Sequence, residues 1–203
     1  MTRALRPLGT GLAMVALMTV VLGLLYPIAM TGVLQGLFPA KADGSLVRVD
    51  GAVVGTDLAG QVFTSPAYFH SRPSATTPAY DPSATTFANL GPNTIALKDA
   101  VDANIAAALT LERPFTPGLT AADLPVDMVT TSGSGVDPDI TPANARLQAN
   151  RIAAVRGLSR DEVDLLIDDH TEGRSLGFLG QPRVNVLRLN IALDQLAGAP
   201  EAR

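Results

Sequence analysis

The sequence predicts an α+β protein: one N-terminal transmembrane helix followed by a single extracytoplasmic α+β domain. No charged residue lies between Arg6 and Lys41, which is typical of a membrane span. Alternating apolar residues near positions 45–63 and helical apolar spacing further on indicate strands and helices in the remainder. The expected divisions are a cytoplasmic N-terminus (1–7), a transmembrane helix (8–30), a membrane-exit connector (31–44), the domain (45–197) and a C-terminal tail (198–203).

The span is expected from Leu8 to Met30. At ~1.5 Å per residue its helix covers roughly 35 Å, enough for a bilayer core of ~30 Å. Tyr26 and Pro27 suit its far interface, where an amphipathic ring is well placed. Residues 31–44, punctuated by Gly and Pro, are expected to lead out of the membrane.

Charge sets the expected orientation. Arg3 and Arg6 precede the span without an acid, whereas the residues after it mix both signs, so the positive-inside rule places the N-terminus in the cytoplasm and the domain outside. The alternative is a cleaved signal peptide ending at Ala40-Lys41-Ala42. That site lies far beyond an apolar stretch longer than a usual signal core, so an uncleaved anchor is favoured.

Small residues recur at helical spacing along the span, where a neighbouring helix can approach closely. They are Gly9, Ala13, Ala16, Thr19 and Gly23. The alternative is that Gly and Ala are simply common in membrane helices.

The first half of the domain shows alternating patterns and loops. Residues 45–50 and 53–63 predict strands, and residues 64–93, rich in Pro, Ser and Thr, predict a long ordered loop. This loop holds aromatic residues that require burial: Tyr68, Phe69, Tyr80 and Phe87. A helix is expected over 94–111, with an apolar face formed by Ile95, Val101, Ile105, Ala108 and Leu109. A Pro-rich connection (114–125) and a strand (126–131) follow.

The C-terminal part shows clear helix boundaries. Thr141-Pro142 is an N-cap followed by proline at the first helical position, and Gly157 ends that helix. Ser159 and Glu162 form a capping box for a helix over 160–170. The last helix, 186–197, is expected to be capped by Asn185.

Composition excludes several functions. Hydrophobic residues make up 47% and charged residues 17% of the chain, and cysteine is absent, which excludes disulfides and thiolate chemistry. After the span, thirteen basic residues face 19 acidic ones, a formal charge of −6 that disfavours nucleic-acid binding.

Motifs for enzymatic chemistry are also missing from the sequence. It contains no phosphate loop, and the two histidines, His70 and His170, lie far apart, so no catalytic residue and no metal ligand is assigned. Asp137 and Asp139 can hold a cation, but a turn and cap is the more common role of Asp-Pro-Asp.

One segment, Val126–Arg156, combines an expected strand, a Ser/Gly-rich turn and a helix start. The turn consists of Ser132, Gly133, Ser134 and Gly135. Free N–H groups at such a place can receive an anion or phosphate. The alternative is a purely structural turn.

Ordered motifs over about 170 residues resemble one family, the C subunit (KdpC) of the high-affinity potassium-transporting P-type ATPase. The segments are Tyr26-Pro27, Thr31-Gly32-x-x-Gln35-x-x-Phe38-Pro39, Gly44-Ser45-Leu46-Val47, Gly60-Gln61-x-Phe63, Tyr68-Phe69-x-x-Arg72-Pro73-Ser74-Ala75, Asn89-Leu90-Gly91-Pro92, Thr131-Ser132-Gly133-Ser134-Gly135-x-Asp137-Pro138, Gln148-x-x-Arg151, Thr171-Glu172 and Pro182-Arg183-Val184-Asn185-Val186-Leu187-x-Leu189-Asn190-x-Ala192-Leu193-Asp194. The sequence departs from the family pattern at Asp139 (histidine expected), Ala88 (serine) and Gln181 (glutamate).

The resemblance implies a non-catalytic accessory subunit in a bacterial inner membrane. Its expected partners are the potassium-selecting A subunit, the ATP-hydrolysing B subunit and the small F subunit. In the family account the C chain is a catalytic chaperone that raises the B subunit's ATP affinity. Gln148 and the Ser132–Gly135 turn are then the nucleotide-binding candidates, with ATP as a possible ligand and no firmly bound cofactor. Subunit contacts are expected at the small-residue stripe and at Thr31, Gly32, Gln35 and Phe38.

The expected topology conflicts with direct nucleotide contact, because ATP is cytoplasmic and the charge pattern places Gln148 outside. The topology fits better with an outer domain that lies over the A subunit's potassium entry and tightens the complex through its span. The negative charge of the domain would concentrate cations near that entry. Two other classes remain open: a membrane-anchored extracytoplasmic enzyme and a solute-binding module.

Overall fold

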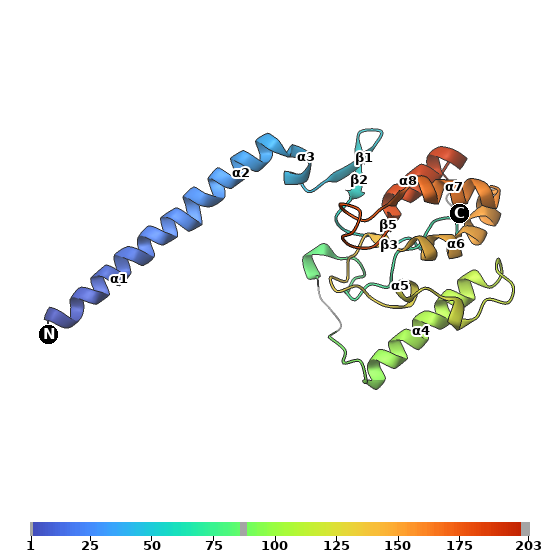
Figure 1. The fold of residues 1–203 in the computed structure, drawn as a ribbon, viewed down its shortest axis with the longest axis horizontal. Helices are drawn as coiled ribbons and strands as arrows, with labels where there is room; N and C mark the ends of the chain where they lie inside the picture. The colour runs from blue at the N-terminus through green and yellow to red at the C-terminus, as the bar shows by residue number, and fades with distance from the viewer. Residues whose placement is uncertain (1, 86–88, 200–203) are drawn as a thin grey trace. The chain divides into compact units, whose positions relative to one another are not determined.

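The computed structural model describes residues 2–85 and 89–199 (Figure 1) and confirms the α+β class. Phe87 and Ala88, noted in the sequence, lie outside the described residues. The chain divides into two compact units, Met1–Leu46 and Val47–Arg203.

The first unit is a long apolar helix. It runs through α1 (Thr2–Val20), a π-helical turn η1 (Val21–Leu25) and α2 (Tyr26–Leu37), followed by the short α3 (Pro39–Ala42). Within the described residues this is the one helix whose length and composition suit a membrane span, over Pro7–Leu37.

Pro27 does not end this helix. The N–H of Tyr26 bonds to the carbonyl of Val21, five residues back, so the π turn absorbs the disruption that proline causes in an α-helical ladder. The helix continues to Leu37, so the first part of the expected membrane-exit connector, 31–37, is helical. Gly32 is tolerated inside the helix, and the backbone leaves helical geometry only at Phe38.

The second unit begins with a two-stranded sheet of β1 (Leu46–Val49) and β2 (Ala52–Thr56). Asp50 and Gly51 between them both have positive φ, as a tight hairpin requires. The strand expected over 53–63 ends at Thr56. Directly after it, the carbonyl of Asp57 accepts from Asn185 and its carboxylate pairs with Arg188.

In the middle of the chain, the described residues 57–85 and 89–94 connect the sheet to a mostly exposed helix. The 3₁₀ turn η2 (Pro82–Ala84) precedes α4 (Ile95–Glu112), which Thr94 caps. Of the apolar face of α4, Val101, Ile105, Ala108 and Leu109 are partly buried, whereas Ile95 in its first turn is 78% exposed.

A second 3₁₀ turn, η3 (Ala121–Asp123), leads into α5 (Val126–Val129). The strand expected at 126–131 is wrong, because this segment is a helical turn. It starts directly after Pro125, and the Thr130 hydroxyl donates back to the Val126 carbonyl.

The C-terminal part packs three helices around a small sheet. The helices are α6 (Pro142–Arg156), α7 (Arg160–Asp169) and α8 (Val186–Ala197), and the caps expected at Thr141, Ser159 and Asn185 are confirmed. The strands β3 (Asp139–Ile140), β4 (Thr171–Glu172) and β5 (Arg183–Asn185) form an antiparallel sheet in the order β3–β5–β4.

The buried core lies between these helices and the sheet. It consists of Ile140, Ala145, Ala149, Ile152, Ala153, Val163, Ile167, Val184, Val186, Leu189 and Leu193, joined by Phe69 from the long segment. Phe69 is fully buried, as expected for an aromatic residue of this loop.

Candidate functional site

A cluster of buried polar side chains surrounds the backbone of residues 66–70. This segment crosses the core without belonging to a strand, so its peptide groups need other partners. Its five consecutive carbonyls, from Pro66 to His70, each accept a hydrogen bond from a side chain of α6 or α8.

Two side-chain amides each bond both the N–H and the carbonyl of one residue in this segment, as the backbone of a neighbouring β-strand would. Asn190 accepts from the N–H of Phe69 (2.8 Å) and donates to its carbonyl (3.0 Å). Gln148 accepts from the N–H of His70 (2.7 Å) and donates to its carbonyl (3.0 Å). We call Gln148 and Asn190 the amide clamp.

Two arginines complete the arrangement. Arg151 donates to the carbonyls of Pro66 and Tyr68, and its Nε pairs with Glu112 Oε1 at 2.9 Å, with both side chains fully buried. Arg156 donates to the carbonyl of Ala67, and its guanidinium lies 4.7 Å from the centre of the Tyr68 ring. The segment is therefore held through its backbone by charged and amide groups.

Gln148 is fully engaged by these contacts. Its Oε1 also accepts from Arg151 (2.8 Å), and its Nε2 also donates to Asn144 Oδ1 (2.8 Å). The amide thus makes four hydrogen bonds, its full complement, and the residue is 1% exposed.

A cavity of about 240 Å³ lies beside the clamp. Gln148, His70 and Asn144 line one side, and α4 contributes Ala107, Ala108 and Leu111. Arg72 and Glu112 also line it. Among the described residues, Arg72 Nε and Glu112 Oε2 are buried without a hydrogen-bond partner. Burial raises the pKa of the Glu112 carboxyl, and the neighbouring Arg151 opposes that rise.

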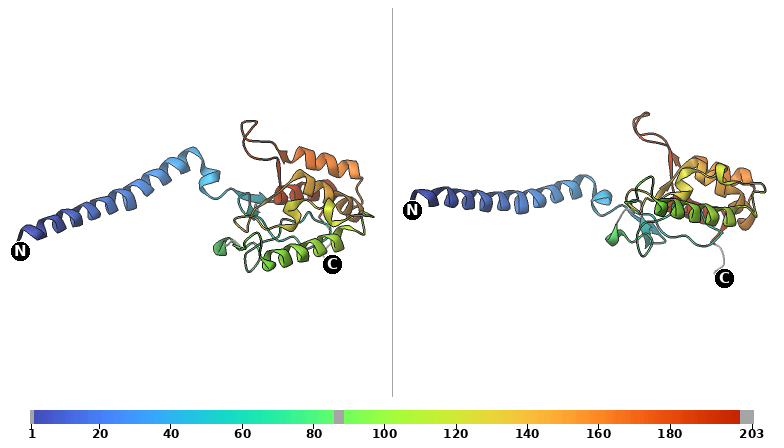
Figure 2. Two further views of the ribbon diagram at one scale, coloured as in Figure 1. Left: turned by 60° about the horizontal axis from the view of Figure 1, so that its bottom comes forward. Right: turned by 90° about the horizontal axis from the view of Figure 1, so that it is seen from below.

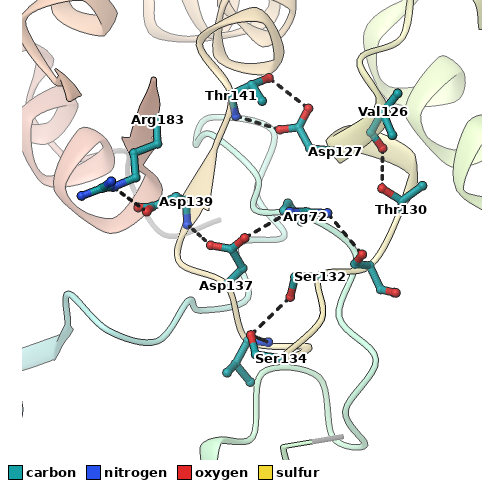
Figure 3. A network of polar contacts seen from close by, with 12 residues as sticks. Arg72, Val126, Asp127, Thr130, Ser132, Ser134, Asp137, Asp139, Thr141 and Arg183 are labelled. Atoms are coloured by element: carbon teal, nitrogen blue, oxygen red, sulfur yellow. Dashed lines mark hydrogen bonds and ion pairs between the residues drawn. The ribbon is translucent and has the colours of Figure 1, made fainter. Parts of the chain in front are cut away.

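The Ser132–Gly135 turn bonds mainly to itself and to the loop beside it (Figure 3). Ser132 Oγ accepts from the N–H of Gly135 (3.0 Å), and Ser134 Oγ accepts from that of Val136 (3.3 Å). Arg72 donates to the Thr131 carbonyl and pairs with Asp137 at 3.1 Å. The turn does not line the cavity, so the structure does not bring it together with Gln148 around that space.

The start of α6 is not open to an external anion. Asp127 of α5 accepts from the N–H of Thr141 (2.8 Å), from its hydroxyl (3.0 Å) and from the amide of Asn144 (3.0 Å). A helix N-terminus is stabilised by a nearby negative charge, and here the Asp127 carboxylate supplies that charge. These contacts favour the alternative of a structural turn over an anion site at this helix start.

Asp137 and Asp139 occupy a turn (Figure 3). Asp137 accepts from the N–H of Asp139 (3.0 Å), and Asp139 pairs with Arg183 of β5 (3.1 Å). Burial, with a contribution from Asp137, raises the pKa of Asp139, and Arg183 opposes this. Both carboxylates thus have partners within the turn or in β5, as a structural turn requires. The described residues contain no group of three or more His, Cys, Asp or Glu suited to a metal.

Gly60 is the close-packing point between the long segment and this turn. A Cβ at Gly60 would lie 2.7 Å from the Asp137 carbonyl oxygen and 2.4 Å from the Tyr80 ring. We expect Gly60→Ala to destabilise the domain by about 1–3 kcal/mol, because the backbone must shift. Urea unfolding of the full chain in detergent, followed by circular dichroism, measures this. Gly133→Ala is the control, since nothing lies within 4 Å of its Cβ position, and it should change stability by less than about 0.5 kcal/mol. Equal effects of the two variants would contradict the packing argument.

His70 should make stability pH-dependent. Burial lowers the pKa of its imidazole below 6.5, and Arg151 adds to this against a hydrogen bond to the Ser65 carbonyl. The unfolded chain then binds the proton more tightly. The contribution of neutral His70 is therefore complete above pH ~6.5 and is lost as pH falls through the lower folded pKa.

NMR titration of the full chain should show the His70 imidazole with a pKa below 6.5, and His170→Gln assigns its signal. Stability should also fall less on acidification in His70→Gln than in the wild type. An His70 pKa above 6.5 would contradict the burial argument.

Within the first unit, the small residues expected to face a partner helix are exposed. Gly9, Ala13, Ala16 and Thr19 lie on α1, and Gly23 lies in η1, where its Cβ position is 3.9 Å from a Thr19 methyl. Thr31, Gly32 and Gln35 lie on α2, and Phe38 ends it, 53% exposed. Their role as subunit contacts stays a prediction.

Fold and site together define a class: a small α+β domain preceded by one helix suited to membrane anchoring, with its buried polar groups engaged in holding its own backbone. The family model described as K⁺-transporting ATPase, c chain (KdpC), matches residues 8–195. Proteins named potassium-transporting ATPase KdpC subunit are 51% identical in Caulobacter vibrioides strain NA1000 (94% of this chain, 92% of the relative) and 48% identical in Variovorax paradoxus (98% and 100%). The one in Koribacter versatilis is 45% identical (96% and 97%).

The chain therefore belongs to the KdpC family. It is a subunit of a K⁺-transporting ATPase, an accessory one and not the catalytic one.

Proposed function

We propose that this chain stabilises an ATP-driven, high-affinity potassium import complex, acting from the outer face of a bacterial inner membrane. Its partners would be the potassium-selecting A subunit, the ATP-hydrolysing B subunit and the small F subunit. The observation that carries the proposal is the extent of the family match, residues 8–195, which takes in both the apolar helix and the domain. The anchor and the domain thus form one functional unit.

The interior of the domain supports a role in assembly. Its largest polar cluster, around Gln148, Arg151 and Asn190, is used to hold residues 66–70. Such a cluster gives a rigid domain with a defined surface, which is what a protein interface needs. One helix suited to the bilayer supports anchoring beside other membrane subunits.

The proposal is tested by purifying the pump with and without this chain through a tag on the A subunit. We expect the full complex to hydrolyse ATP in response to potassium, and the preparation lacking this chain to lose subunits or that response. The isolated chain should not hydrolyse ATP. A pump that assembles and responds fully without this chain would contradict the proposal.

The role in raising ATP affinity is a second candidate, supported by the cavity of about 240 Å³ that Gln148 and Arg72 line. Gln148 would have to release backbone or side-chain partners to contact a nucleotide there. In the assembly account, Gln148→Ala lowers the amount of intact complex but leaves the apparent KM for ATP of the remaining complex unchanged. A raised KM at unchanged complex yield would favour the nucleotide role.

A further inference from the structure

Helix α4 forms an outer layer of the second unit. It lies along one edge of the domain in Figure 1 and on the near side of the domain when seen from below in Figure 2. None of its 18 residues, all of them described, belongs to the hydrophobic core, and Glu112 at its C-terminal end is its one buried residue. A helix with so little burial is held less firmly than the core helices, because local stability follows buried contacts.

The C-terminal end of α4 is anchored to α6 by two contacts. The Glu112 carboxylate pairs with Arg151 at 2.9 Å, with both side chains fully buried. Directly after the helix, the side-chain amide of Asn150 donates to the Thr116 hydroxyl at 2.9 Å. These bonds fix residues 112–116 to the body of the domain.

The remainder of α4 has fewer polar contacts. In its middle, the Asn104 amide donates to the Val129 carbonyl of α5 at 3.0 Å. The ion pair of Lys98 is made to Asp102 of the same helix, so it does not attach α4 to the domain. Apart from the caps at the two helix ends, the bond from Asn104 is the one hydrogen bond that joins residues 95–111 to another described segment.

The cavity of about 240 Å³ lies beneath this loosely held part of α4. Ala107, Ala108 and Leu111 line it from α4, and Asn144 and Gln148 line it from α6. Side chains that face a void lack the packing contacts of a filled interface. Moving α4 away from α6 therefore breaks fewer contacts than moving a close-packed helix would.

We propose that α4 is a hinged lid: it swings as one body about residues 112–116 and opens the cavity beside Gln148. The direction of the movement follows from the contacts, because the helix separates where few of them hold it and turns where the buried ion pair fixes it. When closed, α4 limits entry to the cavity, and when open, it exposes the α6 side. This inference goes beyond the proposed function, since it concerns a movement within this chain.

The test measures distances between two spin labels on the full chain in detergent, by pulsed electron paramagnetic resonance. Leu165→Cys on α7, at a side chain that is 64% exposed, is combined with Ala100→Cys near the start of α4 or with Thr110→Cys near its end. The chain has no other cysteine. We expect the distance distribution to be at least twice as wide for the Ala100 pair as for the Thr110 pair. Equal widths would overturn the proposal, because both ends of α4 would then be held equally.

Asn104→Ala should shift the equilibrium toward the open lid. The Val129 carbonyl then has no donor in the closed state, so the longer-distance population of the Ala100 pair should rise about fivefold. Lys98→Ala is the matched control, since Lys98 pairs with Asp102 of the same helix, and it should leave the distribution unchanged. If Asn104→Ala also leaves it unchanged, the lid does not exist.

Reagent access to the cavity provides a second measurement. Ala108→Cys places a single thiol on the cavity wall, where its reaction with a water-soluble reagent reports opening. Asn104→Ala should raise the rate of this reaction about fivefold. Val163→Cys is the control for unfolding of the whole domain, because Val163 is fully buried in the core, and it should stay unreactive. An unchanged rate at Ala108→Cys, or an equal rate at Val163→Cys, would contradict local opening.

Discussion

Replacing Arg151 by alanine should abolish most of the domain's stability, by about 3–5 kcal/mol, because it leaves the Glu112 carboxylate buried without its partner. Both side chains are fully buried and 2.9 Å apart. The carbonyls of Pro66 and Tyr68 lose their donor in the same variant. Urea unfolding of the full chain in detergent should show either a much lower midpoint or no folded baseline.

Arg146→Ala is the matched control for this effect. Arg146 lies on the same helix and pairs with Asp168, but both side chains are about half exposed, so its loss should cost no more than ~1 kcal/mol. Arg151→Ala/Glu112→Ala should recover part of the loss, since no buried charge is then unpaired, but not the bonds to the carbonyls. Similar unfolding midpoints for the two single arginine variants would contradict a buried structural role of Arg151.

Gln148→Leu should destabilise the domain by about 2–4 kcal/mol. Leucine keeps the volume but leaves the N–H and carbonyl of His70 buried without partners, and each such group costs about 1–3 kcal/mol. Hydrogen exchange at the His70 amide should accelerate selectively in this variant. Gln181→Leu is the control, because Gln181 is exposed and its side chain makes only a 3.4 Å contact with Arg174. Unchanged stability of Gln148→Leu would indicate that the amide is free for a ligand.

The helices that could be predicted from the sequence are those with local boundary signals. Thr141-Pro142 and Gly157 delimit α6, and Ser159 with Glu162 starts α7, because capping bonds form within a few residues of the chain. Such signals do not depend on the rest of the fold, so they can be recognised without it.

The elements that the sequence did not predict correctly depend on contacts between residues far apart in the chain or on features without a sequence pattern. Val126–Thr131 alternates like a strand, but its conformation follows from Pro125 and from the engagement of Asp127 with Thr141, a contact made across 14 residues. The strands β3, β4 and β5 are two or three residues long, too short to show a periodic pattern. The continuation of the apolar helix past Pro27 depends on a π turn, which leaves no mark in composition.

The candidate site was only partly visible in the sequence. Gln148 is a candidate only through the family resemblance, and Arg151 and Asn190 appear in the sequence only as members of the family's motifs. Their common target, the backbone of 66–70, is 78 or more residues away and presents peptide groups of any sequence. Side-chain spacing therefore indicates a buried polar face but not what that face holds.

We propose that the domain works outside the membrane as an assembly subunit, and thiol accessibility tests this placement most directly. Gln148 is buried, so a reporter belongs at an exposed site such as Ala103 of α4, replaced by cysteine in this cysteine-free chain. A second variant, Thr2→Cys, reports on the N-terminus, before the apolar helix. We expect a membrane-impermeant reagent to label Ala103→Cys in intact cells, and Thr2→Cys only in inverted vesicles. The reverse labelling pattern would place the domain beside cytoplasmic ATP, rule out an outer assembly role, and favour the nucleotide role of Gln148.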